Sequence, residues 1–412
     1  EFRRVLFRSI DPDGGRPIVL VGVNGAGKSS ILDAIALMLL RFAEGVRTGN
    51  PDAIESLVDN DLRVGAPSCK ITLTAAFPGF DDGITWTVAK GRPGHVMAVA
   101  TESASLQEVI DSVRRTIGEG APCLPLAVHY PTNRSALDIP ARIRTPHEFT
   151  ALSAYEGALQ GTASDFCGFF EWFREEENIY NEQLALQWSP EQVAAERPAL
   201  SHVRRAIEAF FPGSRGLRIE RRPQKMTLEH RGVRLDVTQL SDGEKCLLAM
   251  IGDLARRMVL VAPQLSDPLQ QRAVVLIDEI ELHLHPALQR TILPRLRGVF
   301  PNTQFVVSTH SPQLLSSVTS QSVRLLEDFQ SKPLERGTWR RDTNRILEAV
   351  FGDPGRPLEV AGKLQALKMA VDDDRVAEAR ALLRELHELM KDEGTGLTDG
   401  QDPEIFFYEQ LL

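Results

Sequence analysis

The sequence contains few cysteines and no long apolar segment. Four cysteines occur among 412 residues, and no two of them form a C-x-x-C pair. This distribution excludes a disulfide scaffold and argues against a zinc ribbon or a thioredoxin-type redox site, and it favours reduced thiols in a cytoplasmic protein. No apolar run approaches the roughly 18 residues that a membrane-spanning helix needs, so we expect no membrane segment.

Internal repeats and long heptad arrays are also absent, which argues against the coiled-coil arms of tethering proteins. The remaining composition is that of an ordinary globular protein, with 42% hydrophobic and 25% charged residues, and the length suggests two or three domains. The net charge of −9 is unevenly spread. Residues 346–412 carry 15 acidic and 7 basic side chains, whereas Ser201–Arg234 carries 9 basic and 3 acidic ones. The acidic total therefore hides one basic segment.

The first nine residues, Glu1–Ser9, resemble the translation of a sequencing adapter. A basic and apolar β-strand is the alternative interpretation. We leave this segment out of the functional reasoning, as one does with fusion scars, and expect native sequence from Ile10.

Short apolar runs predict the buried strands of a sheet. Four such runs end at Val23, Tyr130, Ile277 and Ser308, and predicted helices alternate with them along the chain. This alternation is typical of an α/β protein with a mainly parallel sheet flanked by helices. Alternating polar and apolar residues also predict antiparallel strands at Lys70–Phe77, at Ile84–Ala89 and within Leu217–Val237.

Apolar residues at helical spacing predict helices at Ser29–Glu44, Asp242–Val261 and Ala287–Phe300. Gly45 suits the C-terminal cap of the first helix, and Pro294 is expected to kink the third.

Two further regions are predicted to be mainly helical. One is an insertion at about residues 146–212, whose aromatic cluster at 166–173 we interpret as helix packing. The other is a C-terminal tail, residues 346–412, interrupted at Gly352–Pro357 and Gly394–Gly400.

A glycine-rich loop lies between the first predicted strand and the following helix. Its sequence, GVNGAGKS, matches G-x-x-x-x-G-K-[ST] in the strand–loop–helix context that this motif requires. Glycines let backbone N–H groups close around phosphate oxygens, and the helix N-terminus adds positive potential. Lys28 can reach the β- and γ-phosphates of ATP, and the Ser29 hydroxyl can ligate Mg²⁺. The predicted ATP-binding residues here are Gly22, Asn24, Gly25, Ala26, Gly27, Lys28, Ser29 and Ser30.

An apolar strand that ends in two carboxylates supplies the second motif. Asp278 and Glu279 follow the run that ends at Ile277. In a parallel sheet the C-terminal edge is where ligands bind. We therefore expect Asp278, with Ser29, to hold Mg²⁺, and Glu279 to orient and deprotonate an attacking water.

Two more motifs are ambiguous by themselves. Ser241, Asp242 and Gly243 begin a predicted helix, where they form either an anion site or a plain N-cap completed by Glu244. His310 follows another predicted strand, and it is either a structural histidine or a hydrogen-bond donor to a γ-phosphate.

Taken in order, the four motifs resemble those of ABC-type ATPases. LSDGEK corresponds to their signature motif, and IDEIELHLHP followed by FVVSTHSP is similar to the RecF, SMC and OLD branch. The segments YPTNR and DIPARI, with the tail motif DTNRILEAVFGDPGRP, resemble the PtuA-type ATPases of Septu and retron antiphage systems. The resemblance implies a P-loop NTPase fold of ABC-ATPase type over residues 10–345, with an antiparallel β subdomain.

The same resemblance implies a homodimer, or a higher oligomer, with two ATP molecules held between subunits. Each ATP would lie between the glycine-rich loop of one subunit and Ser241–Gly243 of the other. Asn133 is either the equivalent of the family's Q-loop residue or a turn asparagine. The histidines of ELHLHP resemble the family's D-loop rather than a metal site.

Two functions remain open at this point. In one, the chain is a sensor and regulator of a partner nuclease of HNH type in bacterial antiphage defence. In the other, it is a RecF-like DNA-repair ATPase that acts on DNA without a nuclease partner. The basic segment Ser201–Arg234 is a candidate DNA contact, with an ion-paired surface as the alternative. An adjacent HNH or reverse-transcriptase gene would distinguish the two functions.

Overall fold

The computed structural model describes residues 16–54, 57–62, 64–92, 100–119, 123–133, 149–160, 166–186, 189, 191–192, 198–222, 224–327, 330–334, 346, 350, 358–389 and 403–411. The expectations for Glu1–Ser9, for the DIPARI segment and for most of the 342–357 tail motif lie outside these residues. By its internal contacts the chain divides into two compact units, Glu1–Arg340 and Arg341–Leu412.

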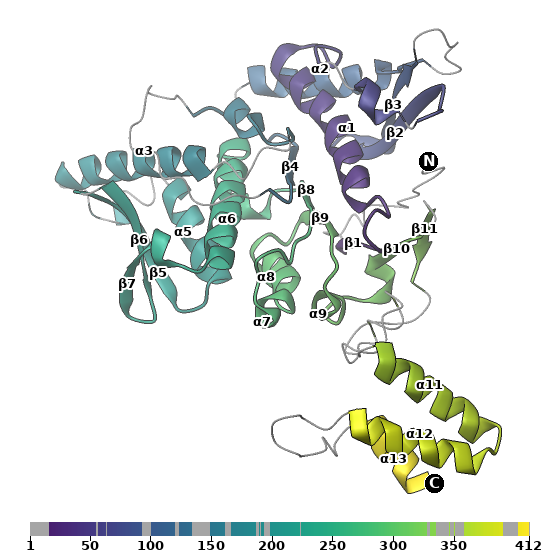
Figure 1. The fold of residues 1–412 in the computed structure, drawn as a ribbon. Helices are drawn as coiled ribbons and strands as arrows, with labels where there is room; N and C mark the ends of the chain where they lie inside the picture. The colour runs from purple at the N-terminus through teal and green to yellow at the C-terminus, as the bar shows by residue number, and fades with distance from the viewer. Residues whose placement is uncertain are drawn as a thin grey trace. The chain divides into compact units, whose positions relative to one another are not determined.

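A six-stranded sheet forms the centre of the first unit (Figure 1). Its order is β11-β10-β1-β9-β8-β4, and every neighbouring pair is parallel except β10 with β11. The strands are β1 (Ile18–Val21), β4 (Leu126–Tyr130), β8 (Ala273–Ile277), β9 (Thr303–Ser308), β10 (Val323–Glu327) and β11 (Gln330–Pro333). Both β4 and β9 are buried along their whole length, as continuous apolar runs predict. The predicted α/β fold with a mainly parallel sheet is confirmed.

The purple and blue elements in Figure 1 are the first long helix, α1 (Lys28–Thr48), and the elements grouped with it. These are the antiparallel pair β2 (Ser68–Phe77) and β3 (Phe80–Gly91), and α2 (Ala104–Gly118). The prediction that Gly45 caps α1 is wrong, because the helix continues to Thr48 and Gly49 caps it with φ +89°. Gly45 serves packing instead. A Cβ atom there would lie 2.2 Å from Cδ1 of Ile110 in α2, so a larger residue would force that side chain to move.

On the other side of the sheet, a second group of helices, teal in Figure 1, packs around α6 (Asp242–Val261). They are α3 (Phe166–Ala185) and α5 (Pro198–Phe210), accompanied by the antiparallel strands β5 (Ser214–Arg221), β6 (Gln224–His230) and β7 (Val233–Asp236). The aromatic cluster of α3 lies in this core, and each ring from Phe166 to Phe173 is at most 4% exposed. The cluster therefore packs helices, as predicted.

A break occurs where one kinked helix was expected at Ala287–Phe300. The short elements of the first unit are α7 (Pro286–Gln289), α8 (Ile292–Val299), α9 (Pro312–Leu315) and the 3₁₀ turns η1 (Asp59–Asp61), η2 (Ala151–Tyr155), η3 (Val237–Gln239), η4 (Pro268–Gln270) and η5 (Ser320–Ser322). The helix is interrupted at Arg290–Thr291, between α7 and α8, so the prediction of a kink at Pro294 is wrong. Pro294 is the third residue of α8, where no intrahelical N–H bond is required.

A buried charged network ties α6 to β4. The Asp253 carboxylate accepts hydrogen bonds from Tyr130 Oη at 3.0 Å, from Arg256 Nη2 at 2.7 Å and from Arg257 Nε at 2.9 Å. Burial opposes ionisation of this carboxyl, but the two arginines hold its pKa below the usual value. Arg257 also donates to the Ala154 carbonyl at 2.6 Å. Removing one partner of such a group is expensive, so the network fixes α6 against the sheet.

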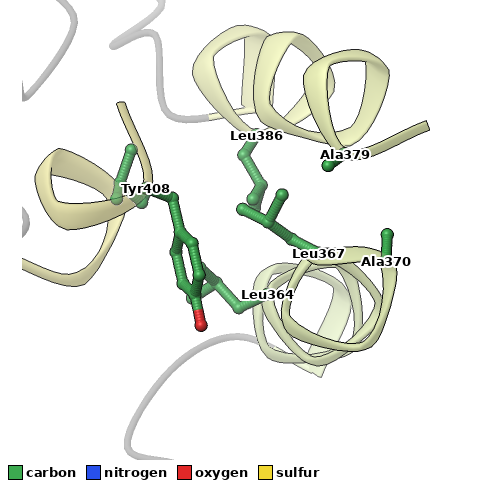
Figure 2. Close-up of a cluster of buried hydrophobic side chains, with 7 residues drawn as sticks. Leu364, Leu367, Ala370, Ala379, Leu386 and Tyr408 are labelled. Carbon is green, nitrogen blue, oxygen red and sulfur yellow. The ribbon is translucent and has the colours of Figure 1, made fainter. Parts of the chain in front are cut away.

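The second unit consists of three described helices, α11 (Leu358–Asp372), α12 (Val376–Leu389) and α13 (Pro403–Leu411). They share a small apolar core (Figure 2) formed by Leu364, Leu367, Ala370, Ala379, Leu386, Ile405 and Tyr408. Asp374, with φ +56°, lies in the tight turn between α11 and α12. The described part of the tail is therefore helical, as predicted.

None of the helices in the described ranges combines the length and the apolar character needed to cross a membrane.

Candidate functional site

The glycine-rich loop joins β1 to α1. Lys28 begins the helix and is only 6% exposed, and its ammonium group donates hydrogen bonds to two loop carbonyl oxygens at 3.0 and 3.1 Å. A Cβ atom on Gly22 would lie 2.6 Å from the carbonyl oxygen of Leu326 in β10. Gly25 and Gly27 have φ values of +78° and +91°, which glycine adopts without strain. The sequence therefore folds here into a tight loop that closes around the ammonium group of Lys28.

The other predicted residues of this loop lie near its surface. Asn24 is exposed, and Ala26 is half-buried with its N–H donated to the Val23 carbonyl at 3.1 Å. Ser29 and Ser30 are exposed on the first turn of α1. Both hydroxyl groups are thus accessible from solvent at the helix N-terminus.

The two predicted carboxylates follow β8 and are held by a residue of the neighbouring strand. The Ser308 hydroxyl, at the end of β9, donates to Oδ1 of Asp278 and accepts the Glu279 N–H at 2.7 Å. Asp278 is 5% exposed and Ser308 is fully buried. Glu279 has φ +44°, which is uncommon for a residue with a side chain. Ser308 thus fixes both carboxylate residues, a role that sequence reasoning did not assign to it.

His310 lies two residues beyond Ser308. Its backbone N–H donates to the Glu281 carboxylate, another residue that the sequence did not single out. Burial lowers the pKa of the imidazole, and the Lys28 charge lowers it further, while Glu281, Glu279 and Asp278 act in the opposite direction.

Lys28 is in the same electrostatic environment. Burial lowers the pKa of its ammonium group, and Glu279, Asp278 and Glu281 oppose that shift. Because β1, β9 and β8 are adjacent in the sheet, the residues at their C-terminal ends form one charged cluster. The structure therefore brings together Lys28, Asp278, Glu279 and His310, as the sequence predicted.

The Ser241 motif forms a separate cap at the start of α6. Glu244 donates its N–H to Ser241 Oγ at 3.3 Å, and its carboxylate accepts the Ser241 N–H at 3.0 Å. This is the capping box that the alternative interpretation describes. Gly243 also has a steric reason to be glycine, because a Cβ atom there would lie 2.4 Å from the carbonyl oxygen of His283. The motif therefore contacts the loop that follows Glu279.

Comparison with known proteins identifies the family of the chain. The family model AAA_21, described as "AAA domain, putative AbiEii toxin, Type IV TA system", matches residues 168–316. The chain is 31% identical to "Retron Ec83 probable ATPase" of Escherichia coli, over 83% of this chain and 72% of that protein. The chain therefore belongs to the family of this retron ATPase. As a family member it is itself an ATPase, which confirms the enzyme class predicted from the motifs.

Other relatives of this ATPase carry the names that the sequence suggested. "Retron Vc95 probable ATPase" of Vibrio cholerae serotype O1 biovar El Tor is 27% identical, over 76% of this chain and 69% of that protein. "Septu protein PtuA" of Bacillus mycoides (strain KBAB4) is 22% identical, over 76% of this chain and 37% of PtuA. Among solved structures, the "SMC head domain from Thermotoga maritima" matches with a TM-score of 0.40 and 19% identity, covering 78% of this chain and 91% of that one. The resemblance to retron and Septu ATPases is confirmed.

The remaining motif residues of the ATPase lie at turns. Asn133 is exposed after β4. His285 caps α7 by accepting the Ala287 N–H at 3.2 Å, and His283 is exposed with φ +63°. The two histidines thus have local structural roles in the loop that contacts Gly243.

Six of the nine basic residues of Ser201–Arg234 lie within ion-pair distance of a carboxylate, and three of the six share one carboxylate. Arg204 pairs with Glu177, Arg205 with Asp267 and Arg215 with Glu229, while Arg218, Lys225 and Arg234 surround Glu220. These pairs support the ion-paired surface that was the alternative to a DNA contact. Arg221 differs from them, because its hydrogen bond goes to the neutral amide oxygen of Asn178 at 2.9 Å.

Proposed function

We propose that this ATPase binds ATP with Mg²⁺ at the Lys28 loop and hydrolyses it with Glu279 as the base. The observation that carries the proposal is the convergence of Lys28, Asp278, Glu279 and His310 at the ends of three adjacent strands. A buried ammonium group can hold phosphate oxygens, and carboxylates can hold a cation and accept a proton.

The residues present fit a magnesium nucleotide. Mg²⁺ prefers oxygen ligands, and the exposed Ser29 hydroxyl and the Asp278 carboxylate provide two of them. When bound, the cation offsets the negative charge of the phosphates. Gly22, Asn24, Gly25, Ala26, Gly27 and Ser30 would contribute loop contacts. The Ser308 hydroxyl holds the Asp278 carboxylate in one orientation, so this residue needs little rearrangement.

The proposed chemistry needs one base and two phosphate contacts. Glu279 accepts the proton of a water that attacks the γ-phosphorus, as the bond to the bridging oxygen breaks and ADP leaves. Lys28 binds the phosphate oxygens through its positive charge. His310 donates one ring N–H to the γ-phosphate, and its lowered pKa favours the neutral imidazole, which still has one donor.

A second copy of the chain would complete each site. In this proposal Ser241, Asp242 and Gly243 of one subunit face the γ-phosphate bound by the other. The contact between Gly243 and the His283 carbonyl supports a link between the two half-sites, because His283 follows Glu279 by only four residues. A homodimer with two ATP molecules is the simplest assembly of this kind.

The relatives support a role in antiphage defence. Three of them carry retron or Septu names, which favours the defence role over a RecF-like repair ATPase. We propose that ATP turnover regulates a partner nuclease of HNH type. An HNH or reverse-transcriptase gene beside this gene would support the role, and a lone gene among repair genes would contradict it.

Substitution of the proposed base tests the chemistry. Glu279→Gln keeps the shape of the side chain and removes its basicity, so ATP binding should persist while steady-state hydrolysis falls by about 100-fold or more. Glu281→Gln removes a neighbouring charge and serves as the matched comparison. ATP titration and phosphate release are measured on both variants. Near-normal hydrolysis in Glu279→Gln would remove Glu279 as the base, and so would a larger loss in Glu281→Gln.

A further inference from the structure

A pocket of about 280 Å³ lies between α3 and the hairpin of β5 and β6, elements that Figure 1 shows well apart from the loop between β1 and α1. Its lining residues are Arg174, Glu177, Asn178, Ile219, Arg221 and Gln224. On α3, Arg174 lies three residues before Glu177 and four before Asn178, so the three share one face of the helix. Ile219 and Arg221 share one face of β5, and Gln224 is the register partner of Arg221 on β6.

The one acidic residue of the pocket already has its partners. Oε1 of Glu177 accepts a hydrogen bond from Arg204 at 2.7 Å, and Oε2 accepts the Ile219 N–H at 2.8 Å. Arg204 is not part of the lining, so its charge balances Glu177 from behind. Glu177 therefore does not balance the charge of Arg174 and Arg221, the two arginines that line the pocket.

The arginines of the lining lack acidic partners in the described part of the chain. Arg221 donates to the neutral Asn178 amide. Nε of Arg174 is buried and has no hydrogen-bond partner among the residues that the structure describes. This Nε is shielded from solvent, so the guanidinium ends of the two arginines, rather than this atom, are the groups that a ligand would meet. The pocket therefore presents two guanidinium groups that suit an acceptor from outside.

We propose that this pocket binds a single phosphate-bearing group of nucleotide size, held by Arg174 and Arg221. Guanidinium groups match the geometry of phosphate oxygens better than other cations do. The volume is near the lower limit for ligand pockets, about 300 Å³, so one nucleotide fits and an extended ligand does not. The amides of Asn178 and Gln224 add donors and acceptors for a sugar or a base. A free nucleotide and the terminal nucleotide of a nucleic-acid strand share this chemistry.

Binding at the pocket is measured on the full chain carrying Lys28→Ala, which weakens nucleotide binding at the other site. The probes for calorimetric titration are pyrophosphate, 5′-AMP, a short 5′-phosphorylated oligothymidylate and its unphosphorylated counterpart. At least one phosphate probe should bind. The double substitution Arg174→Gln with Arg221→Gln should weaken that binding by about tenfold or more. Gln224→Glu, an exposed change that adds a negative charge beside the pocket, should weaken it without risk to the core.

The matched control is Arg205→Gln with Arg215→Gln, which removes the same charge from arginines outside the pocket. It should leave binding unchanged. Loss of AMP binding in the pocket variants identifies a free nucleotide, and loss confined to the phosphorylated oligonucleotide identifies a strand terminus. Either result supports the site. The proposal is overturned if no probe binds, if the unphosphorylated oligonucleotide binds equally well, or if pocket and control variants lose affinity alike.

Discussion

Ser308 offers the sharpest test of how the carboxylates are positioned. Its hydroxyl is fully buried, donates to the Asp278 carboxylate and accepts the Glu279 N–H. Ser308→Ala removes both hydrogen bonds and leaves the volume of the side chain nearly unchanged. We expect the chain to fold and to bind ATP, because Lys28 and its loop are unaltered, and we expect hydrolysis to slow.

The magnitude follows from the two lost bonds. A hydrogen bond to a charged group contributes about 1.5–3 kcal/mol, and a neutral one about 1 kcal/mol. If the bond to the carboxylate is the part that orders the site for reaction, the barrier rises by about 1.5–3 kcal/mol. Since each 1.36 kcal/mol is a factor of ten, kcat should fall by roughly 10- to 100-fold. KM for ATP should change by less than about threefold, because the lost bonds do not hold the nucleotide.

Steady-state phosphate release and thermal unfolding measure the two effects separately. Ser214→Ala is the matched control, because Ser214 is also buried and bonds a side chain, His230, at 2.7 Å in the β5–β6 sheet. It should lose stability without losing kcat. If Ser308→Ala is folded and hydrolyses ATP at the parental rate, the hydroxyl does not position the carboxylates. A rise in KM alone would refute the reasoning equally.

Three further substitutions test other parts of the chain. Ser241→Arg and Lys28→Ala should each abolish hydrolysis, and a mixture of the two should regain it through one intact composite site; a plain N-cap predicts no regain and a stability loss of about 1 kcal/mol. Gly252→Ala should destabilise the fold by about 1–2 kcal/mol in denaturant unfolding, because its Cβ would lie 2.7 Å from a buried ring of α3 and overpacking outweighs the gain in helix propensity; an increase in stability would contradict this. Tyr130→Phe should cost about 1–3 kcal/mol by removing a donor to the buried Asp253, and an unchanged unfolding midpoint would show that the network tolerates the loss.

Features that depend on neighbouring residues were predictable from the sequence. The apolar runs became β1, β4, β8 and β9, and the glycine-rich loop joined a strand to a helix, because pattern and turn chemistry act over a few residues. The juxtaposition of Lys28 with Asp278 was also predictable, since the ends of parallel strands meet at one edge of a sheet.

Features set by tertiary contact were not predictable in the same way. Gly45 and Gly49 both suit a helix cap, and the structure has the cap at Gly49 and Gly45 packed against Ile110 of α2. Likewise, nothing near Ser308 in sequence shows that its hydroxyl bridges two residues of another strand. The register of β8 with β9 creates that bridge, because it pairs Ile277 with Val307 and so places Asp278 beside Ser308. A polar residue at the end of a buried strand, one register position beyond its last apolar neighbour, is therefore the signal that would have found Ser308.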